Sequence, residues 1–368
     1  MSSETTRLNV AIVGSGIIGA NHAEAIGRHP RLRVAALVDA RIEAAEGLAA
    51  KLDPRPACHL TLAEALRAQP IDLVAVCTPS GLHVEAAEQT LRAGAHLLVE
   101  KPLDTSLAKA REFAKVALEA EGRGLVCAMV SQHRFDPAMV AVQAAVRDGR
   151  LGRVTSAVVS MPWWRDQAYY DSADWRGTWA YDGGGALANQ GIHLVDQMLA
   201  LLGRPEEVYA RTAMVCHERI EVEDLAVATI RFAGGALAVL HATTGAHPGL
   251  PVRLALHGTG GSAILHDDQL EYFHSATPGD LDLDIVAPGE RYGATKAADG
   301  FVVGHLRQYQ DIVEAIDTGR PPGVRVADGL LALALVRAVY VSATLGRPVD
   351  FGQVLDGVFD DVTVTTQE

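Results

Sequence analysis

The sequence predicts an α/β domain built on a doubly wound parallel sheet, followed by an α+β domain. In the first 130 residues, continuous apolar runs of strand length alternate with Ala-, Glu- and Leu-rich segments of helical spacing. That alternation is typical of parallel strands covered by helices on both faces. From about Val154, alternating segments follow one another without helices between them, which indicates an antiparallel or mixed sheet. We therefore expect domains at residues 1–130 and 131–368, and the last helices could pack back on the first domain.

The first domain alternates strands and helices in order. The expected strands are Leu8–Val13, Val34–Val38, Leu73–Cys77, Leu97–Val99 and Leu125–Val130. The helical segments between them include Ile42–Lys51, Val84–Ala93 and Leu107–Glu119. In a sheet of this kind, ligands bind at the carboxyl ends of the strands.

The second domain has a different rhythm. An expected strand, Val154–Met161, leads through a loop rich in Trp, Tyr and Asp to a helix over about Ala186–Leu202. Further strands are expected at Val208–Val215, Leu225–Phe232, Leu237–Thr243, Val252–His257 and Ser262–His266. The helical stretches Gly304–Thr318 and Ala327–Leu345 follow, separated by the breaker Gly-Arg-Pro-Pro-Gly.

Composition excludes several classes of protein. The 32 basic and 45 acidic side chains give a formal charge of −13, which argues against a nucleic-acid partner. The four cysteines form no C-x-x-C pair, so we expect neither a disulfide scaffold nor a metal site. The N-terminal residues lack a signal-peptide pattern, and no apolar stretch reaches the roughly 18 residues that cross a bilayer. We therefore expect a cytoplasmic protein with no membrane partner.

A glycine-rich motif follows the first expected strand. It consists of Gly14, Ser15, Gly16, Ile17, Ile18 and Gly19. A G-x-G-x-x-G pattern is weak alone, but here it lies between a strand and a helix, and Asp39 ends the second strand 20 residues after Gly19. The glycines allow a tight turn, close approach of the backbone to a pyrophosphate, and close packing of helix on strand. The motif predicts a dinucleotide site of the Rossmann kind.

Asp39 bears on which dinucleotide binds. A carboxylate there would bind the ribose 2′-hydroxyl and repel a 2′-phosphate, which favours NAD. Arg41, two residues later, could instead hold such a phosphate. We expect NAD as the cofactor, with NADP as the less favoured alternative.

Two further segments follow strands of the same sheet and should face the cofactor. They supply Thr78, Pro79, Ser80 and His83 after one strand, and Glu100, Lys101 and Pro102 after the next. Most lysines are solvated surface residues. Lys101, however, ends a nearly continuous apolar strand, and partial desolvation would lower its pKa toward the range of a general acid/base.

Together with the segment Gly183–His193, these motifs resemble the Gfo/Idh/MocA oxidoreductases over essentially the whole chain. The resemblance implies an N-terminal Rossmann domain and a C-terminal domain with a large, open, mainly antiparallel sheet. It also implies NAD(P)-dependent oxidation or reduction of a secondary alcohol on a sugar, sugar acid, nucleotide sugar or cyclitol. Lys101 matches the family's catalytic lysine and His193 its catalytic histidine. Homodimers or homotetramers built on the open sheet are implied as well.

The spacing of residues at and after the end of the segment Gly183–His193 also allows an interpretation that does not depend on the resemblance. Asn189, His193 and Asp196 are four and three residues apart, so on a helix they would share one face. A histidine so placed is more often a core residue, and two ligands without a third make a metal site weak. Many family members have an aspartate where this chain has Asn189. A neutral amide would not stabilise a charged His193, which favours Lys101 as the base. The sequence Asn-Gln-Gly-Ile-His resembles members that act on nucleotide-linked hexosaminuronates.

The segment between Met161 and Gly183, which we call the aromatic loop, contains all four tryptophans of the chain. Aromatic rings pack on sugars and arginine binds carboxylate or phosphate, although such rings could equally anchor a long loop. The expected substrate-binding residues are Lys101, Arg134, Trp163, Arg165, Tyr170, Trp175, Arg176, Asn189, His193 and His305.

The sequence thus predicts an NAD-dependent dehydrogenase of a sugar-like polyol, with Lys101, His193 and Asn189 in the catalytic site. Two alternatives remain open. Some relatives use tightly bound NAD for transient oxidation during glycoside hydrolysis. Others bind the dinucleotide as sensors without catalysis, although a sensor has no use for a proton-transfer pair.

Overall fold

The fold consists of two compact units, which we describe separately. A computed structural model describes residues 7–277, 284–295 and 300–366. Among these, residues 7–104, 109–132 and 300–329 form the first unit, and residues 105–108, 133–277, 284–295 and 330–366 form the second. The boundaries expected from the sequence, 1–130 for a dinucleotide-binding domain and 131–368 for a substrate-binding and oligomerisation domain, remain a prediction.

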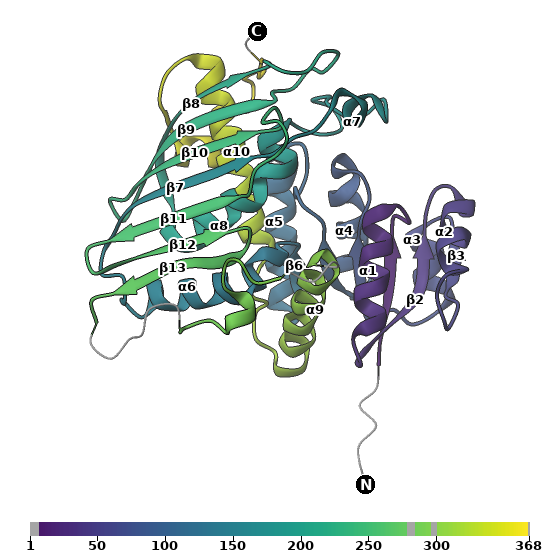
Figure 1. Ribbon diagram of the computed structural model, residues 1–368. Coiled ribbons are helices and arrows are strands. Elements are labelled where there is room, and N and C mark those ends of the chain that lie inside the picture. Colours follow the sequence, from purple (N-terminus) through teal and green to yellow (C-terminus); the bar gives the residue numbers. More distant parts are fainter. Residues whose placement is uncertain (1–6, 278–283, 296–299, 367–368) are drawn as a thin grey trace. The chain divides into compact units, whose positions relative to one another are not determined.

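The first unit contains a six-stranded parallel sheet with the order β3-β2-β1-β4-β5-β6 (Figure 1). Its strands are β1 (Leu8–Val13), β2 (Leu32–Val38), β3 (Ala57–His59), β4 (Leu73–Val76), β5 (His96–Val99) and β6 (Cys127–Met129). The sheet grows in both directions from β1, so the strand order reverses beside β1 and β4. This confirms the doubly wound Rossmann architecture and puts the carboxyl ends of β1 and β4 where dinucleotides bind.

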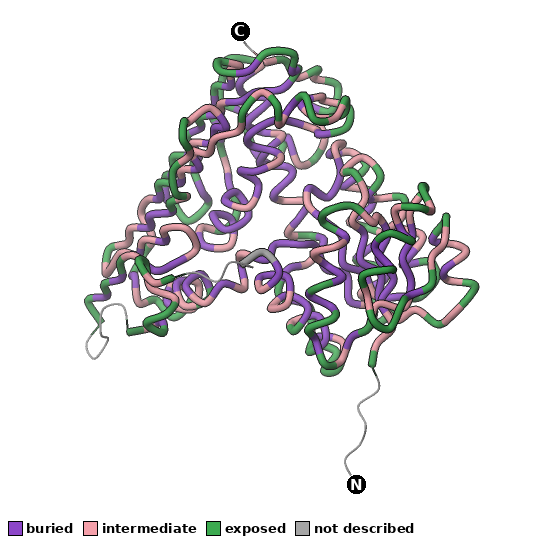
Figure 2. The backbone as a smooth tube through the Cα atoms, turned by 45° about the vertical axis from the view of Figure 1, so that its right-hand side comes forward, coloured by how far each residue is buried: buried purple, intermediate pink, exposed green. Residues whose placement is uncertain are grey.

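Helices flank this sheet. They are α1 (Ile17–Arg28), α2 (Ile42–Ala49), α3 (Leu62–Ala68), α4 (His83–Arg92), α5 (Leu107–Gly122) and α9 (Gly300–Thr318), with the short 3₁₀ turn η1 (Ser80–Leu82) before α4. From α9, Tyr309 and Ile312 join Ile26 of α1 in the core of this unit. Buried residues, purple in Figure 2, gather around the parallel strands.

The second unit is built on an eight-stranded sheet with the order β13-β12-β11-β7-β10-β9-β8-β14. Its strands are β7 (Val154–Pro162), β8 (Pro205–Ala213), β9 (Leu225–Phe232), β10 (Leu237–Thr243), β11 (Arg253–Gly258), β12 (Gly261–His266), β13 (Gln269–Ser275) and β14 (Val349–Asp350). Only β7 and β10 pair in parallel, and the other neighbours are antiparallel. The large, mainly antiparallel sheet is thereby confirmed.

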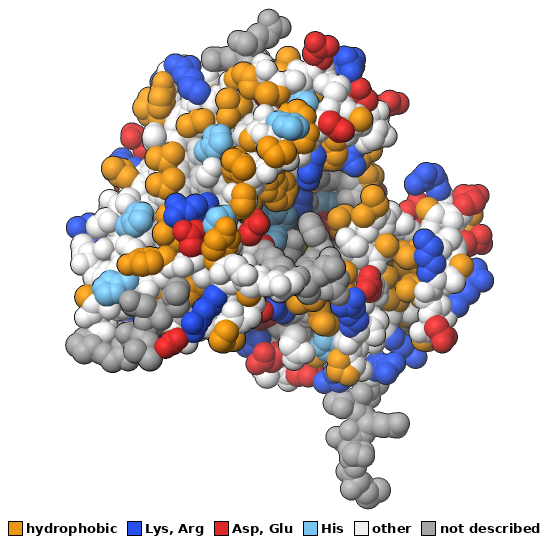
Figure 3. Space-filling view, viewed as in Figure 1, with side chains coloured by type: hydrophobic (Ala, Val, Ile, Leu, Met, Phe, Trp, Pro, Cys, Tyr) orange, Lys and Arg blue, Asp and Glu red, His pale blue; other side chains and the backbone are white. Residues whose placement is uncertain are grey.

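The two faces of this sheet differ. Helix α8 (Ile192–Leu202) and the π-helix η3 (Ala186–Gly191) pack on β7 and β10, and α6 (Pro137–Arg147) packs on β12 and β13. The other face, turned to the viewer in Figure 3, carries hydrophobic side chains over the strands. Those exposed by more than a third are Val158, Tyr209, Val227, Leu237, Val239 and Tyr272.

One helix departs from the expectation that no segment is apolar enough to cross a membrane. Helix α10 (Val326–Leu345) passes that test by length and hydropathy, yet 72% of its most apolar window is buried inside the structure. The core helix of a soluble protein has the same composition. The remaining short elements are η2 (Gln132–Phe135), α7 (Gln167–Asp171), η4 (Pro288–Glu290) and α11 (Phe351–Leu355).

Candidate functional site

The glycine-rich turn links β1 to α1 in the first unit. Gly14 has a φ of +101°, and a Cβ there would lie 2.5 Å from the Cys77 carbonyl oxygen, so only glycine fits. A Cβ on Gly19 would collide with the Gly14 carbonyl oxygen. A Cβ on Gly16, in contrast, would meet nothing within 4 Å, which leaves the start of α1 open. The open helix N-terminus is the part of the turn that can receive a phosphate group.

Asp39 connects this turn to the next one. Its carboxylate accepts hydrogen bonds from the Ser15 N–H at 2.9 Å and from the Arg41 N–H at 2.9 Å. Each oxygen keeps a lone pair for a further donor such as a ribose hydroxyl. The structure therefore brings Asp39 next to the glycine-rich turn, as the spacing predicted.

Two buried hydroxyl oxygens test whether a dinucleotide fits here. Ser15 Oγ and Thr78 Oγ1 have no hydrogen-bond partner among the residues that the structure describes. They follow β1 and β4, the strands beside which the sheet order reverses. Buried polar atoms are normally satisfied, so these two fit a site that is completed by a polar ligand.

His83 joins the turns that follow β4 and β5. Its ring is buried, with Nε2 at 2.8 Å from the Thr78 carbonyl oxygen and Nδ1 at 2.7 Å from that of Pro102. Burial lowers the pKa of His83, although hydrogen bonds to the two carbonyls oppose the shift. His83 thus fixes the two turns relative to each other, while Pro79 and Ser80 lie on the surface of the first.

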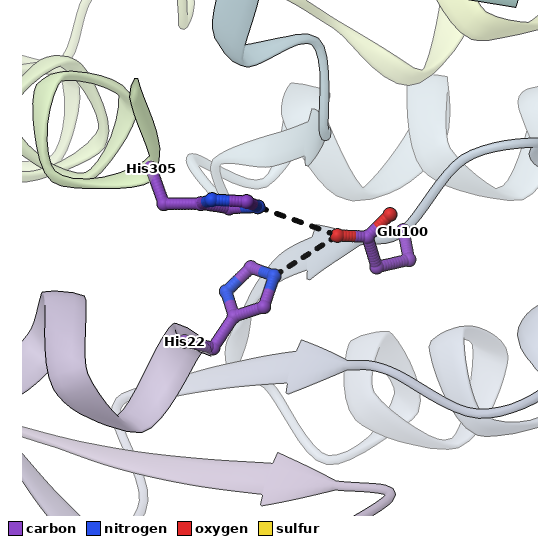
Figure 4. A group of neighbouring side chains, drawn as sticks. All are labelled: His22, Glu100 and His305. Atoms are coloured by element: carbon purple, nitrogen blue, oxygen red, sulfur yellow. Dashed lines mark hydrogen bonds and ion pairs between the residues drawn. The ribbon is translucent and has the colours of Figure 1, made fainter. Parts of the chain in front are cut away.

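A buried cluster of His22, Glu100 and His305 lies behind these turns (Figure 4). His22 comes from α1, Glu100 follows β5, and His305 comes from α9. Glu100 Oε1 lies 3.1 Å from His22 Nε2 and 3.5 Å from His305 Nε2. Glu100 Oε2 accepts the Lys101 N–H at 3.0 Å. The cluster was missed from sequence, which assigned Glu100 to the cofactor and His305 to the substrate.

Charge in this cluster is held on the carboxylate. Burial alone would raise the pKa of Glu100, but hydrogen bonds from His22 and His305 outweigh it and hold that pKa well below the usual range. Burial lowers the pKa of His22, so its ring is neutral near pH 7. His22 Nε2 then donates to Glu100, and Nδ1 accepts from the Tyr309 hydroxyl at 2.7 Å.

In the second unit, the π-helix η3 carries Asn189 and leads into α8, which carries His193. The helix expected over about Ala186–Leu202 is present, but it begins as a π-helix, so Asn189 does not share an α-helical register with His193. The distortion has a visible cause. Buried Glu223 accepts hydrogen bonds from the Gly185 N–H at 2.9 Å and the Leu187 N–H at 2.8 Å.

Glu223 also accepts the Tyr340 hydroxyl at 3.0 Å, and it pairs with no cation among the residues that the structure describes. Burial raises its pKa to about 7, although those hydrogen bonds oppose the shift. The Asn189 amide donates to Asp182 at 3.2 Å, and Asp182 also accepts the Gly177 N–H at 2.7 Å. Asp182 is a buried carboxylate that sequence reasoning did not single out.

Arg134 and Asp196 lie together. Arg134 Nε is 2.6 Å from Asp196 Oδ2, and Nη2 is 2.5 Å from Oδ1, so the pair is bidentate and buried. The structure therefore gives Arg134, expected to bind substrate, a carboxylate partner inside the second unit. It also assigns Asp196 to an ion pair rather than to a metal set with His193.

A second histidine cluster borders His193. The rings of His133 and His193 meet edge to face with their centroids 5.0 Å apart. His133 Nδ1 lies 3.0 Å from Asp136 Oδ2 and 3.2 Å from Asp268 Oδ1. Burial alone would lower the pKa of His133, but the two aspartates outweigh it and raise that pKa to about 10. His133 is therefore a protonated ring beside His193.

Both histidine clusters have the spacing of a metal site. In each, the three ligand atoms lie within 4.8 Å of one another. The hydrogen bonds and ion pairs already account for both arrangements without an ion.

The aromatic loop brings two arginines to one tyrosine. The guanidinium carbons of Arg165 and Arg176 lie 5.2 Å and 4.5 Å from the centre of the Tyr169 ring. Arg165 also lies over Trp163, and Arg176 over Trp175. Tyr170, in contrast, is buried and bonded to the Thr244 hydroxyl at 2.8 Å, which points to an anchoring role.

Comparison with known proteins agrees with this geometry. Residues 8–128 match the model of an oxidoreductase family with an NAD-binding Rossmann fold, and residues 139–264 match the GFO/IDH/MocA C-terminal domain. Inositol 2-dehydrogenase of Rhizobium meliloti is 27% identical over 348 residues, which cover 92% of this chain and 97% of that protein. The scyllo-inositol 2-dehydrogenase (NADP⁺) IolW of Bacillus subtilis is 27% identical over 294 residues, 76% of this chain and 78% of the relative.

Among solved structures, the WlbA dehydrogenase from Bordetella pertussis, in complex with NADH and UDP-GlcNAcA, is 30% identical with a TM-score of 0.82. The alignment covers 94% of this chain and 98% of that one.

Proposed function

Because the chain belongs to the Gfo/Idh/MocA family and is an NAD-dependent dehydrogenase, we propose that it oxidises or reduces a secondary alcohol of a sugar, sugar acid, nucleotide sugar or cyclitol, with Lys101 and His193 in proton transfer. The observation that carries the proposal is the anchoring of Lys101. The backbone N–H of Lys101 donates to the Glu100 carboxylate, and that carboxylate is fixed in the buried cluster of His22, Glu100 and His305. A general base must be held in place, and this cluster supplies a rigid support.

NAD, when bound, takes up or releases the hydride. The residues that would hold it are the glycine-rich turn, Asp39 and the segment after β4, where Ser15 Oγ and Thr78 Oγ1 lack partners among the described residues. Asp39 would accept ribose hydroxyls and repel a 2′-phosphate, which favours NAD over NADP.

Lys101 would accept the hydroxyl proton as the alcohol becomes a carbonyl. It must be neutral to do so, and it lies partly buried directly after β5. His193 would hydrogen-bond the same oxygen and support the developing charge. The rings of His133 and His193 meet edge to face, so the charge on His133 lies directly beside His193.

The relatives name the first substrates to test. The Rhizobium relative is an inositol dehydrogenase, and the Bordetella relative was solved with UDP-GlcNAcA. Formation of NADH from NAD, or of NADPH from NADP, is followed with inositols, hexoses, hexuronates and nucleotide sugars, for the wild type and for Lys101→Met. We expect the variant to lose about 10³-fold in kcat, within the usual range for a general base, and to keep its affinity for NAD.

Lys115→Met is the matched control, because Lys115 is an exposed lysine paired with Glu112 on the same unit. Normal turnover of Lys101→Met with the active substrate would refute the role of Lys101. Release of nitrophenol from p-nitrophenyl glycosides, without any alcohol oxidation, would favour glycoside hydrolysis instead.

The open face of the large sheet completes the proposal. Its exposed Val158, Val227 and Val239 suit contact with a second copy of the chain, as a homodimer or homotetramer requires. Light scattering of the wild type and of Val239→Lys would test this, and we expect the variant to shift toward monomer.

A further inference from the structure

The aromatic loop holds two positive charges that the described protein does not neutralise. Neither Arg165 nor Arg176 forms an ion pair with a carboxylate among the described residues. Some arginines of the same unit are paired, such as Arg134 with Asp196 and Arg219 with Asp171, whereas Arg204, Arg211 and Arg347 also lie over aromatic rings without an ion pair among the described residues.

Three of the four aspartates in the loop are engaged elsewhere: Asp166 accepts the Tyr169 N–H at 2.9 Å, Asp171 pairs with Arg219, and Asp182 accepts the Gly177 N–H. The fourth, Asp174, is exposed and forms no ion pair with either arginine among the described residues. The arginines are instead held by aromatic rings, which orient a guanidinium group without cancelling its charge.

Several polar atoms around Tyr169 lack partners in the described part of the chain. Nε of Arg165 and Nε of Arg176 are buried donors without an acceptor. The Tyr169 oxygen already accepts from Arg176 Nη1 at 3.0 Å and from Gln190 Nε2 at 3.1 Å, so its own O–H must point to a further acceptor. Gln190 is buried, and its Oε1 is unpartnered as well. Donors therefore predominate, and an oxygen anion would satisfy them.

We propose that Arg165 and Arg176, arranged around Tyr169, bind an anionic group of the substrate. This deepens the proposed dehydrogenase function and rests on it. The group is a carboxylate, as in a sugar acid, or a phosphate, as in a sugar phosphate or nucleotide sugar, and a guanidinium fork suits both. Gln190 ties this site to the proposed catalytic residues, since it lies on η3 directly after Asn189 and ahead of His193.

Tryptophan fluorescence provides a direct test, because all four tryptophans of the chain lie in this loop. The full-length protein saturated with NAD is titrated at constant ionic strength with D-glucuronate, D-galacturonate, D-glucose 6-phosphate and UDP-glucose. D-Glucose and D-galactose are the neutral counterparts. We expect saturable binding of at least one anion, at least about 10-fold tighter than that of its neutral counterpart. The uronates and the phosphates then distinguish the two sources of charge.

The variants assign the effect to the two arginines. Arg165→Gln and Arg176→Gln should each weaken binding of that anion about 10- to 100-fold and leave the neutral sugar unchanged. Arg176→Lys, which keeps the charge and the packing but loses the fork, should lose less and guards against misfolding of the glutamine variants. Arg231→Gln is the control, because Arg231 lies on β9 and is already paired with Glu206 at 2.8 Å.

Equal binding of charged and neutral sugars, no binding of any anion, or unchanged affinity in both glutamine variants would each overturn the anion site. Turnover of a neutral polyol by the wild type would leave the dehydrogenase function standing in that case. Anion binding without NADH formation from any alcohol would instead overturn the function and keep the site.

Discussion

Each unit contains a cluster of histidine and carboxylate side chains, and the two clusters hold their charge on opposite partners. In the first unit, His22 and His305 share Glu100, whose pKa lies well below its usual range while that of His22 is lowered. In the second unit, a single ring, His133, is shared by Asp136 and Asp268, and its pKa is raised to about 10.

The difference teaches that the ratio of imidazoles to carboxylates, together with burial, decides where the charge lies. Two rings around one carboxylate, all shut away from water, leave His22 neutral because burial penalises a charged imidazole. Two carboxylates around one partly exposed ring overcome the same penalty. A negative charge therefore lies behind Lys101 and a positive one lies beside His193.

The largest effect is expected from Glu100→Gln. The amide replaces an ionised acceptor that serves His22 and the Lys101 N–H, so the free energy of unfolding should fall by about 3 kcal/mol. The kcat should fall at least 10-fold, because the backbone support of Lys101 is lost. Urea denaturation and NADH formation measure the two effects.

The pH dependence of this variant sharpens the test. Since the pKa of Glu100 is lowered in the folded protein, its contribution to stability is present above the unfolded pKa of about 4.3 and is lost as the pH falls toward the folded pKa. The wild type should lose this increment in acid, and Glu100→Gln should not. Glu112→Gln, an exposed control, should match the wild type. Equal unfolding curves for Glu100→Gln and the wild type would contradict a charge on Glu100.

Glu223 extends the comparison to a carboxylate whose hydrogen-bond donors are neutral, and Glu223→Gln ranks second. The backbone donors of Gly185 and Leu187 would face an NH₂ group in place of one oxygen, which should cost about 2 kcal/mol at pH 5. The cost should shrink at pH 8. Burial raises the pKa of Glu223 to about 7, so the wild type loses stability as the pH rises from about 4.3 through 7. Urea denaturation at the two pH values decides, and an equal cost at both would show that Glu223 is ionised throughout.

Asp268→Asn should have a smaller effect. The substitution leaves His133 with one carboxylate, so the pKa of His133 should fall below its value of about 10. The free energy of unfolding at pH 7 should fall by only about 1 kcal/mol, because the pair is partly exposed. A raised histidine pKa stabilises fully below about pH 6.5, and the increment is lost as the pH rises toward 10. NMR titration of His133 measures the shift. The neighbouring Asp267→Asn, also at positive φ, is the control, and titration near pH 6.5 in all three proteins would reject the assignment.

The sequence predicted most of the fold but neither of the two histidine clusters. The bounds of strands β9 and β10 were predicted to the residue, because apolar and polar residues alternate in strands that have one buried and one exposed face. Strand β3 was missed, since three half-exposed residues carry no period. Helix α3, also missed, is fixed by a capping box between Thr61 and Glu64.

The glycine-rich turn could be predicted because its residues are neighbours in the chain. His22 and Glu100 are 78 residues apart and meet only when the sheet has formed. The π-helix is a tertiary effect as well, because Glu223 binds the Leu187 N–H across 36 residues. The spacing of residues in the sequence predicts local geometry. It does not predict the charge state of a histidine, because that state depends on partners that can lie far away in the chain.

The smallest expected effect tests the neutral state assigned to His22. Tyr309→Phe removes the hydroxyl that donates to Nδ1 and leaves a buried acceptor unsatisfied, so the free energy of unfolding should fall by about 1 kcal/mol with little change in kcat. The control Tyr272→Phe, at an exposed tyrosine, should leave the free energy of unfolding unchanged. If His22 were protonated, both nitrogens would donate, and removing the hydroxyl would strand a charge and cost several-fold more. ¹⁵N chemical shifts of the His22 ring distinguish the two cases, because only the neutral ring leaves Nδ1 without a proton to accept the Tyr309 hydroxyl.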